Sequence, residues 1–330
     1  MNLAILGAGA WGTALGIAMS AQHRPTLWCR DLQQYERIRA EGLNSRYLPG
    51  VQLPGALRLT ADSGAALSDA DLVIAAVPTA ALRETLRLVA QSPRRSGVVW
   101  LCKGFEPVSS KFPHQVAAEE LGDSYPFAAL SGPSFAGEVA RGLPAAVTLA
   151  SADSGFAVLA ARELHTGRFR VYSSDDLAGV ETGGAVKNVI AIAAGVCDGL
   201  KLGNSARAAL VTRGLAEMTR LGLALGGRIE TFMGLAGAGD LILTATSDLS
   251  RNRRVGLGLG SGRRLADILA ELGHVAEGVG TAREVVRLAA EKRVDMPIAT
   301  AVWRLLDGQV SAQAAFEELM NREPKHESVH

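Results

Sequence analysis

The sequence has few cysteines and almost no net charge, and each shortage excludes a class of protein. Its three cysteines, Cys29, Cys102 and Cys197, lie far apart and form no CxxC pair. We therefore expect a reducing compartment, without a disulfide framework or a structural metal. The 34 Lys and Arg residues balance the 33 Asp and Glu residues, so the chain lacks the basic excess that is typical of a nucleic-acid-binding protein.

Membrane and secretion signals are also missing from the sequence. No apolar run looks long enough, and free enough of charge, to span a bilayer. The chain starts with a strand-like NLAILG, without the basic segment, hydrophobic region and cleavage site of a signal peptide. These absences predict a cytoplasmic protein without a membrane span.

What is present is a chain of 330 residues, long enough for two domains that each bury a core. Up to about residue 175, short apolar runs alternate with helical patterns such as TAALRETLRLVAQ. This alternation is typical of a doubly wound α/β domain with a parallel sheet. The runs expected as buried strands are LAILG, PTLWC, DLVIAAV, GVVWLC, PFAAL and AAVTLA.

The second part of the chain has a different pattern. Beyond residue 178 the strand-like runs stop, and amphipathic patterns such as AREVVRLAAEK and AQAAFEELMN follow. We predict an α/β domain over residues 1–177 and an all-helical domain over residues 178–330. The Pro- and Gly-rich segment 43–59 is expected as a loop, and the polar tail after Arg322 as disordered.

A glycine-rich turn follows the first expected strand. The sequence there is GAGAWG, with Gly7, Gly9 and Gly12. The GxGxxG pattern alone is weak, but here it follows a strand and opens a helix in a βαβ context, which predicts a dinucleotide site. The first glycine would allow the tight turn, the second the approach of the pyrophosphate, and the third close helix–strand packing. The alternative is a plain tight turn.

Two charged residues end the second expected strand. An Arg at this point can hold the 2′-phosphate of NADP, whereas an acidic residue binds the ribose 2′-hydroxyl of NAD. Arg30 comes first and favours NADP, while Asp31 keeps NAD possible. The alternative is that Arg30 is only a solvated charge at a strand end.

Two further segments suit an anion. Ligands of open α/β sheets bind beyond the carboxyl ends of the strands, and Lys103 follows such a strand. Its ammonium group suits a phosphate or a carbonyl oxygen. The segment SGPSFAGE, residues 131–138, predicts a Gly-Pro turn before a short helix, whose amides and Ser134 hydroxyl face an anion.

An apolar helical pattern in the second part contains a lysine. The stretch VETGGAVKNVIAIAAGV, residues 180–196, places Lys187 among Gly, Ala, Val and Ile. Buried lysines are rare unless paired, and a desolvated lysine is a frequent catalytic base. One interpretation is close helix packing with the lysine reaching outward to solvent. The other is a catalytic lysine in a face of small residues that leaves room for a substrate.

A second group of polar residues occurs at GLAGAGDLILTATSDLSRNRRVG, residues 234–256. Asp240 follows a flexible GAG, so its carboxylate can approach another group closely. Ser250, Arg251 and Asn252 precede a helical run, and an Arg fork, an amide and a helix start together suit a phosphate. The alternative is a basic surface turn.

These motifs together resemble the bacterial NAD(P)-dependent glycerol-3-phosphate dehydrogenases. The resemblance runs through nearly the whole chain, in the segments GAGAWGTAL, CKGFE, SGPSFAGEV, ETGGAVKNVIAIAAG, GNSARAAL, TRGLAEM, GLAGAGDL, SRNRRVG and AEGVGT. It implies a Rossmann domain, an all-α domain like that of 6-phosphogluconate dehydrogenase, and a homodimer. It also implies reversible reduction of dihydroxyacetone phosphate to sn-glycerol 3-phosphate, which supplies phospholipid synthesis.

The resemblance also assigns roles by position. Lys187 matches the proton acceptor and donor of the family, and we count Asp240 with it as catalytic. The substrate contacts are Lys103, Gly132, Ser134, Lys187, Asp240, Ser250, Arg251 and Asn252. The cofactor contacts are the three glycines Gly7, Gly9 and Gly12 with Ala10, Trp11, Arg30, Lys103, Ala136, Arg251, Val275 and Glu277. Many relatives have Ser where this chain has Ala10, a change that a backbone amide tolerates.

The chemistry of a carbonyl reduction agrees with a lysine at position 187. Hydride addition leaves negative charge on the carbonyl oxygen, which an ammonium group both stabilises and protonates. Near-neutral operation favours a Lys187 pKa below its ordinary value, which burial and Lys103 would promote and Asp240 would oppose. Two rival interpretations stay open: another two-domain hydroxyacid dehydrogenase, and a non-catalytic protein that senses NAD(P).

Overall fold

The structure, a computed structural model, describes all residues except 108, 274–275 and 324–330. Two of the sequence predictions, the cofactor contact at Val275 and the disorder of the tail, lie wholly or largely outside the described residues. The chain divides into two compact units, Met1–Leu177 and Ala178–His330.

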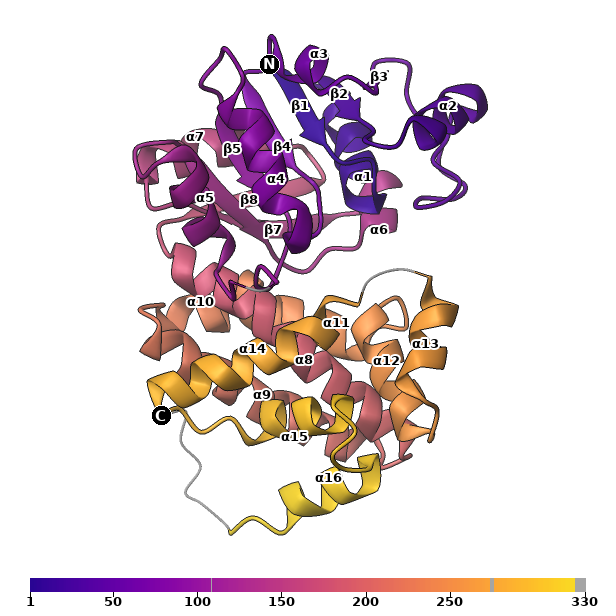
Figure 1. The fold of residues 1–330 in the computed structure, drawn as a ribbon, viewed down its shortest axis with the longest axis vertical. Helices are drawn as coiled ribbons and strands as arrows, with labels where there is room; N and C mark the ends of the chain where they lie inside the picture. Colours follow the sequence, from indigo (N-terminus) through magenta and orange to yellow (C-terminus); the bar gives the residue numbers. More distant parts are fainter. Residues whose placement is uncertain (108, 274–275, 324–330) are drawn as a thin grey trace. The chain divides into compact units, whose positions relative to one another are not determined.

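The first unit is built on one eight-stranded sheet with the strand order β3-β2-β1-β4-β5-β6-β7-β8 (Figure 1). All neighbouring strands are parallel except β6 and β7. The strands are β1 Asn2–Leu6, β2 Arg24–Trp28, β3 Arg58–Thr60, β4 Leu72–Ala75, β5 Gly97–Trp100, β6 Phe127–Ser131, β7 Ala145–Ala150 and β8 Phe169–Ser174. The helices are α1 Ala10–Met19, α2 Leu32–Glu41, α3 Ser63–Leu67, α4 Thr79–Ala90, α5 Pro113–Leu121, α6 Ala136–Ala140 and α7 Ser154–Leu164.

The sequence prediction of a doubly wound α/β unit is confirmed, and all six expected strands are present. Two short or one-sided strands, β3 and β8, were missed. β3 has three residues at the sheet edge, and its start lies in the segment that was expected as a loop. β8 lies at the other edge and alternates buried and exposed residues through Phe169, Arg170 and Val171. Neither strand is the continuous apolar run that marks a strand buried on both faces.

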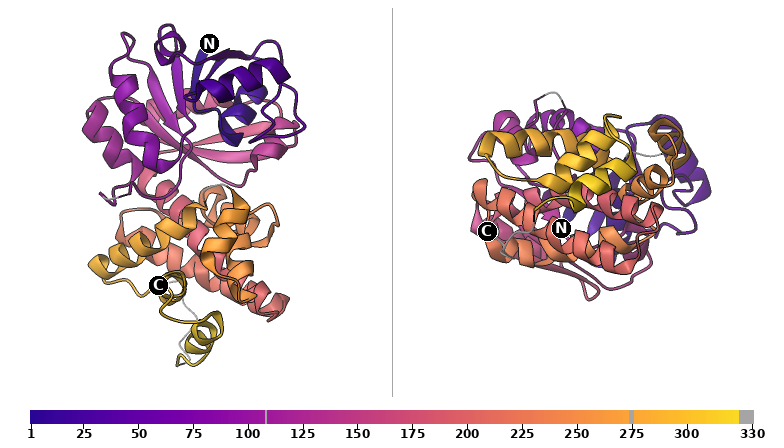
Figure 2. Two further views of the ribbon diagram at one scale, coloured as in Figure 1. Left: turned by 45° about the vertical axis from the view of Figure 1, so that its right-hand side comes forward. Right: turned by 90° about the horizontal axis from the view of Figure 1, so that it is seen from below.

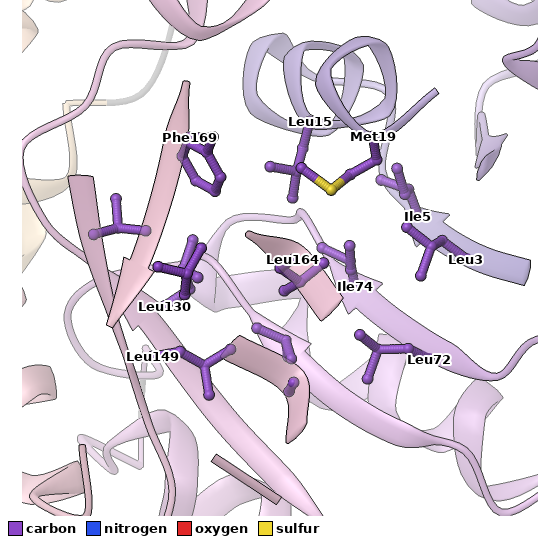
Figure 3. Close-up of a cluster of buried hydrophobic side chains, with 14 of the residues drawn as sticks. Leu3, Ile5, Leu15, Met19, Leu72, Ile74, Leu130, Leu149, Leu164 and Phe169 are labelled. Atoms are coloured by element: carbon purple, nitrogen blue, oxygen red, sulfur yellow. The ribbon is translucent and has the colours of Figure 1, made fainter. Parts of the chain in front are cut away.

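The core of this unit lies between the sheet and the helices that cover it. The strand β1 contributes Leu3 and Ile5, and helix α1 contributes Leu15 and Met19, all of them fully buried or nearly so. Figure 3 shows these side chains converging with others from β4, β6, β7, α7 and β8. The further labelled members are Leu72, Ile74, Leu130, Leu149, Leu164 and Phe169. Their burial fixes the sheet, and with it the positions of the loops at the strand ends.

The second unit is helical, as the sequence predicts (Figures 1 and 2). Its helices are α8 Leu177–Gly199, α9 Asn204–Ala224, α10 Ile229–Met233, α11 Asp240–Thr246, α12 Arg251–Gly260, α13 Leu265–Leu272, α14 Glu277–Lys292, α15 Pro297–Leu306 and α16 Ala312–Met320. A single π-helical turn, η1 at Leu235–Gly239, leads directly into α11. The GAG before Asp240 is therefore a wide helical turn rather than the flexible loop that the sequence suggested.

The long helix α8 corrects one expectation. It has 23 residues and a mean hydropathy of 1.3, so by length and composition alone it could cross a membrane. Its apolar window is completely buried inside the protein, and Figure 1 shows the helix running through the middle of the helical unit. The apolar run is long because α8 has neighbours on all sides, which makes it a core helix.

Candidate active site

The glycine-rich turn joins β1 to α1 at the carboxyl end of the sheet. Gly7 has φ +117°, and a Cβ there would lie 2.5 Å from the carbonyl oxygen of Ala76. A Cβ on Gly12 would lie 1.9 Å from the Gly7 carbonyl oxygen, so helix and turn touch at this point. Beside Gly9, in contrast, there is open space, since a Cβ would meet no atom within 4 Å. The turn is thus closed on the protein side and open where a diphosphate would approach.

The first turn of α1 is suited to bind an anion. Its N-cap is Gly9, and no described side chain caps it. Ala10 and Trp11 begin the helix and are partly exposed. The first amides of a helix lack partners within the helix, and the helix dipole favours negative charge beside them. These residues fit the diphosphate of a dinucleotide cofactor.

The charged pair after β2 has divided roles. Asp31 is the N-cap of α2, where its Oδ1 accepts the amides of Gln33 at 2.9 Å and Gln34 at 3.4 Å. Arg30 is 72% exposed, with its guanidinium 3.9 Å from the Glu84 carboxylate. The Asp31 carboxylate already caps α2, whereas the Arg30 guanidinium is accessible to a ligand. The local structure therefore favours Arg30 as the residue that binds a 2′-phosphate.

Lys103 and the segment after β6 follow strands that run parallel to β1. The strands β1, β4, β5 and β6 are successive parallel neighbours, so their carboxyl ends share one edge of the sheet. Lys103 follows β5, and its carbonyl oxygen accepts the Thr79 hydroxyl at 3.3 Å. Gly132 has φ +146°, and its carbonyl oxygen accepts the Ser134 hydroxyl at 3.1 Å. Ala136 begins α6. Topology thus collects these residues beside the glycine-rich turn.

Lys187 does not reach outward to solvent. It lies in α8 and is only 6% exposed, and its ammonium Nζ lies 2.6 Å from Oδ1 of Asp240. Asp240 is the first residue of α11 and is 1% exposed. Two opposite charges this deeply buried are stable only when they are paired and hydrogen-bonded. The structure therefore brings together the two residues that were predicted to be catalytic.

A third group completes this cluster, and sequence reasoning missed it. The Thr244 hydroxyl oxygen lies 3.0 Å from Lys187 Nζ, and the same hydroxyl lies 2.6 Å from the Asp240 carbonyl oxygen. Thr244 is one helical turn after Asp240 on α11, so the spacing of the two residues was a usable signal. The hydroxyl accepts from Lys187 and donates to the helix backbone, which fixes the ammonium group from a second side.

A glycine near Lys187 on α8 allows close packing of a neighbouring helical turn instead of leaving space for a ligand. A Cβ on Gly183, one turn before Lys187, would lie 2.6 Å from the carbonyl oxygen of Ala236 in η1. The π-helical turn therefore packs backbone against backbone on α8, and this contact places Asp240 opposite Lys187. The interpretation that this face leaves room for a substrate is wrong at Gly183, because η1 fills the space.

The SRN segment begins α12, as predicted. Ser250 is its N-cap, and the Ser250 hydroxyl accepts the amide of Arg253 at 3.2 Å. Arg251 is exposed and forms no ion pair or hydrogen bond with any residue that the structure describes. Arg253, which belongs to the same basic run, is buried and binds Asp198 of α8 at 2.6 Å. The run is therefore more than a basic surface turn, since one of its arginines anchors the helix and another is free to bind.

Asn252 belongs to an amide relay that joins three helices. Its Nδ2 donates to Oδ1 of Asn188 at 2.9 Å, and its Oδ1 accepts the amide of Gly278 at 3.0 Å. Asn188 in turn lies 3.5 Å from the Glu277 carboxylate. Asn188 follows Lys187 directly in α8, so these hydrogen bonds connect α8 to Asn252 and Glu277, two residues that were predicted to bind ligands. Sequence reasoning had noted this asparagine without giving it a role.

A cavity of the helical unit lies away from Lys187 and Asp240. It has a volume of about 910 Å³ and is lined by α8, α9, α15 and α16, but by neither Lys187 nor Asp240.

Among the described residues, no group of three or more His, Cys, Asp or Glu side chains is placed to hold a metal ion. The three cysteines are free and buried, and burial, with a contribution from Asp31, raises the pKa of Cys29 to about 11.

Comparison with known proteins identifies the family. Models described as the N-terminus and the C-terminus of NAD-dependent glycerol-3-phosphate dehydrogenase match residues 2–157 and 176–317. A glycerol-3-phosphate dehydrogenase (NAD(P)+) of Nitrosospira multiformis is 58% identical over 331 residues, and one of Dechloromonas aromatica is 57% identical over 327 residues. Each alignment covers 99% of both chains.

Solved structures agree with this result. The crystal structure of glycerol-3-phosphate dehydrogenase from Coxiella burnetii has a TM-score of 0.92 and 43% identity to this chain, and it covers 97% of this chain and 98% of its own. The resemblance seen in the motifs is thus confirmed over both units. The chain belongs to the family of NAD-dependent glycerol-3-phosphate dehydrogenases.

Proposed function

We propose that this protein catalyses the reversible reduction of dihydroxyacetone phosphate to sn-glycerol 3-phosphate, with NAD or NADP as the cofactor. The product is the backbone of glycerophospholipids, so the reaction supplies their synthesis. The observation that carries the proposal is the buried Lys187–Asp240 pair, with 2.6 Å between Nζ and Oδ1. A buried lysine that is held at a fixed position suits proton transfer to a substrate, which a protein that only binds a cofactor does not need.

The chemistry at Lys187 follows from the groups around it. When bound, the nicotinamide supplies the hydride that adds to the carbonyl carbon of the substrate. The Lys187 ammonium group stabilises the negative charge that develops on the carbonyl oxygen and gives this oxygen a proton. In the reverse direction the amine takes the proton from the substrate hydroxyl. Asp240 stabilises the ammonium form, and Thr244 limits its rotation through the 3.0 Å contact.

We assign the phosphate of the substrate to Ser250, Arg251 and Asn252 at the start of α12, with Lys103, Gly132 and Ser134 as the contacts from the first unit. Arg251 supports this assignment because its guanidinium is exposed, and an arginine fork binds phosphate through two hydrogen bonds. Asn252 is held in place by Asn188 and Gly278, so its amide is oriented before any ligand binds.

We assign the cofactor to residues 1–177 and the catalytic groups to residues 178–330. The glycine-rich turn, Ala10, Trp11 and Ala136 would hold the diphosphate and its neighbours, while Arg251, Val275 and Glu277 would contact the cofactor from the second unit. Arg30 would bind the 2′-phosphate, which predicts use of NADPH beside NADH. We further propose that the protein is cytoplasmic and forms a homodimer, as expected for the family. Light scattering on the purified protein tests the dimer, and cell fractionation tests the location.

Initial rates test the proposed function. NADH and NADPH oxidation is measured with dihydroxyacetone phosphate, with unphosphorylated dihydroxyacetone and with 2- and 3-keto acids. Selective turnover of the phosphorylated substrate is expected. Preference for a keto acid would favour another two-domain hydroxyacid dehydrogenase, and cofactor binding without any turnover would favour an NAD(P)-sensing protein.

A further inference from the structure

The segment that carries Lys103 is closed on itself through Glu106. It runs from the end of β5 to the start of α5, and those of its residues that the structure describes form no helix or strand. The Glu106 amide donates to the Lys111 carbonyl oxygen at 2.9 Å, and the Glu106 carbonyl oxygen accepts the Ser110 amide at 3.0 Å. The rings of Phe105 and Phe112 pack with their centroids 4.6 Å apart. Glu106 is therefore the residue about which this segment folds.

The Glu106 carboxylate is held by a residue of a neighbouring helix. Arg83, in the second turn of α4, donates from Nε to Oε1 at 2.7 Å and from Nη2 to Oε2 at 2.8 Å. This two-bond arrangement fixes both the distance and the plane of the carboxylate. Glu106 is only 9% exposed, so an unpaired carboxylate there would be costly. The hydrogen bonds from Arg83 hold the pKa of Glu106 below its ordinary value.

Arg83 also ties the segment to the helix that follows it. Its guanidinium donates to Glu119 at 2.8 Å and to Glu120 at 2.6 Å, both in α5. Figure 1 shows α4 and α5 side by side. The Thr79 hydroxyl, one turn before Arg83 on α4, donates to the Lys103 carbonyl oxygen. Helix α4 thus hydrogen-bonds the segment at two points, through Thr79 at Lys103 and through Arg83 at Glu106.

We propose that Arg83 is a positioning residue of the reaction, which sets the place of Lys103 by clamping Glu106. The inference rests on the proposed function, in which Lys103 contacts the substrate. Arg83 itself belongs to none of the predicted substrate or cofactor contacts. The two parallel hydrogen bonds from its guanidinium fix the orientation of the Glu106 carboxylate and with it the backbone of the Lys103 segment. A single ammonium group would leave the plane of the carboxylate free to rotate.

A double-mutant cycle tests the proposal. The variants are Arg83→Met, Lys103→Met and the double variant, and kcat and KM are measured with dihydroxyacetone phosphate. Arg83→Met should lower kcat/KM by roughly ten- to a hundredfold, mainly through KM, because misplacing a binding group by about 1 Å costs up to about a hundredfold. In the Lys103→Met background the same change should have little further effect, since the group that Arg83 positions is gone.

Matched variants separate positioning from general stability. Arg87→Met alters a neighbouring arginine of α4 whose guanidinium hydrogen-bonds Glu120 rather than Glu106, and it should leave KM unchanged. Arg83→Lys keeps the charge and loses the fork, so its KM should lie between those of wild type and Arg83→Met. Should Arg83→Met not fold, Arg83→Lys and Glu106→Gln run the same cycle, with melting temperatures recorded for all variants.

The outcomes are distinguishable. Additive losses in kcat/KM would overturn the role of Arg83, because they would show that it acts independently of Lys103. An unchanged kcat/KM in Lys103→Met would overturn it as well. A wild-type protein that does not reduce dihydroxyacetone phosphate would instead refute the proposed function.

Discussion

Glu217 predicts an unusual pH dependence of stability. It lies in α9, is 2% exposed, and accepts the amides of Ile298 at 2.7 Å and Ala299 at 3.1 Å. These amides belong to the first turn of α15, whose N-cap Met296 has no side-chain cap of its own. Glu217 therefore caps a helix that lies far from it in the sequence.

Burial raises the pKa of Glu217 from its ordinary value of 4.5 to about 7, although the two amides and Arg220 lower it. A pKa that is higher in the folded than in the unfolded protein means that the folded protein binds more protons between these two values. The contribution of Glu217 to stability is therefore full below about pH 4.5 and is lost as pH rises through about 7. A difference of about 2.5 pKa units, at about 1.36 kcal/mol each, corresponds to about 3 kcal/mol.

Urea unfolding of wild type and Glu217→Gln, followed by circular dichroism from about pH 5 to about pH 8, measures this contribution. Glutamine keeps the shape and does not titrate, so the difference between the two unfolding free energies should change by about 3 kcal/mol, with wild type relatively more stable at low pH. Glu230→Gln, at an exposed glutamate of the same unit, is the control and should show no such change. Parallel pH profiles for wild type and Glu217→Gln would refute the reasoning.

Three substitutions test the proposed site. Lys187→Ala should lower kcat by several orders of magnitude and destabilise the protein by about 3–5 kcal/mol, because Asp240 is then buried without a counterion; near-wild-type kcat would refute its catalytic role. Arg251→Ala should lower kcat/KM for the phosphorylated substrate roughly tenfold to 150-fold, from about 1.5–3 kcal/mol for a charge-assisted contact. An equal loss with unphosphorylated dihydroxyacetone would show that Arg251 does not bind the phosphate. Arg30→Ala should raise KM for NADPH much more than KM for NADH, and equal changes would exclude a contact with the 2′-phosphate.

The sequence alone determined the fold class and the place of the glycine-rich turn at the end of the first strand. Buried parallel strands are continuous apolar runs, so six of the eight strands were predictable. The glycine pattern was equally direct. Only a residue without a side chain fits at Gly7, because a Cβ there would lie 2.5 Å from the Ala76 carbonyl oxygen. The lysine within an apolar helix identified Lys187, since such a residue requires a partner.

Tertiary structure decided which partners these residues have. Lys187 and Asp240 are 53 residues apart, and their contact depends on a π-helical turn that packs against Gly183, a shape that the letters GAG do not specify. Without its partner, Lys187 would be a local cost to stability; with Asp240 buried beside it, removing the lysine becomes the more costly change. In the same way, Arg83 and Glu217 look like ordinary surface charges in the sequence. Their roles come from groups distant along the chain, because burial and hydrogen bonding are properties of the folded protein and local spacing does not encode them.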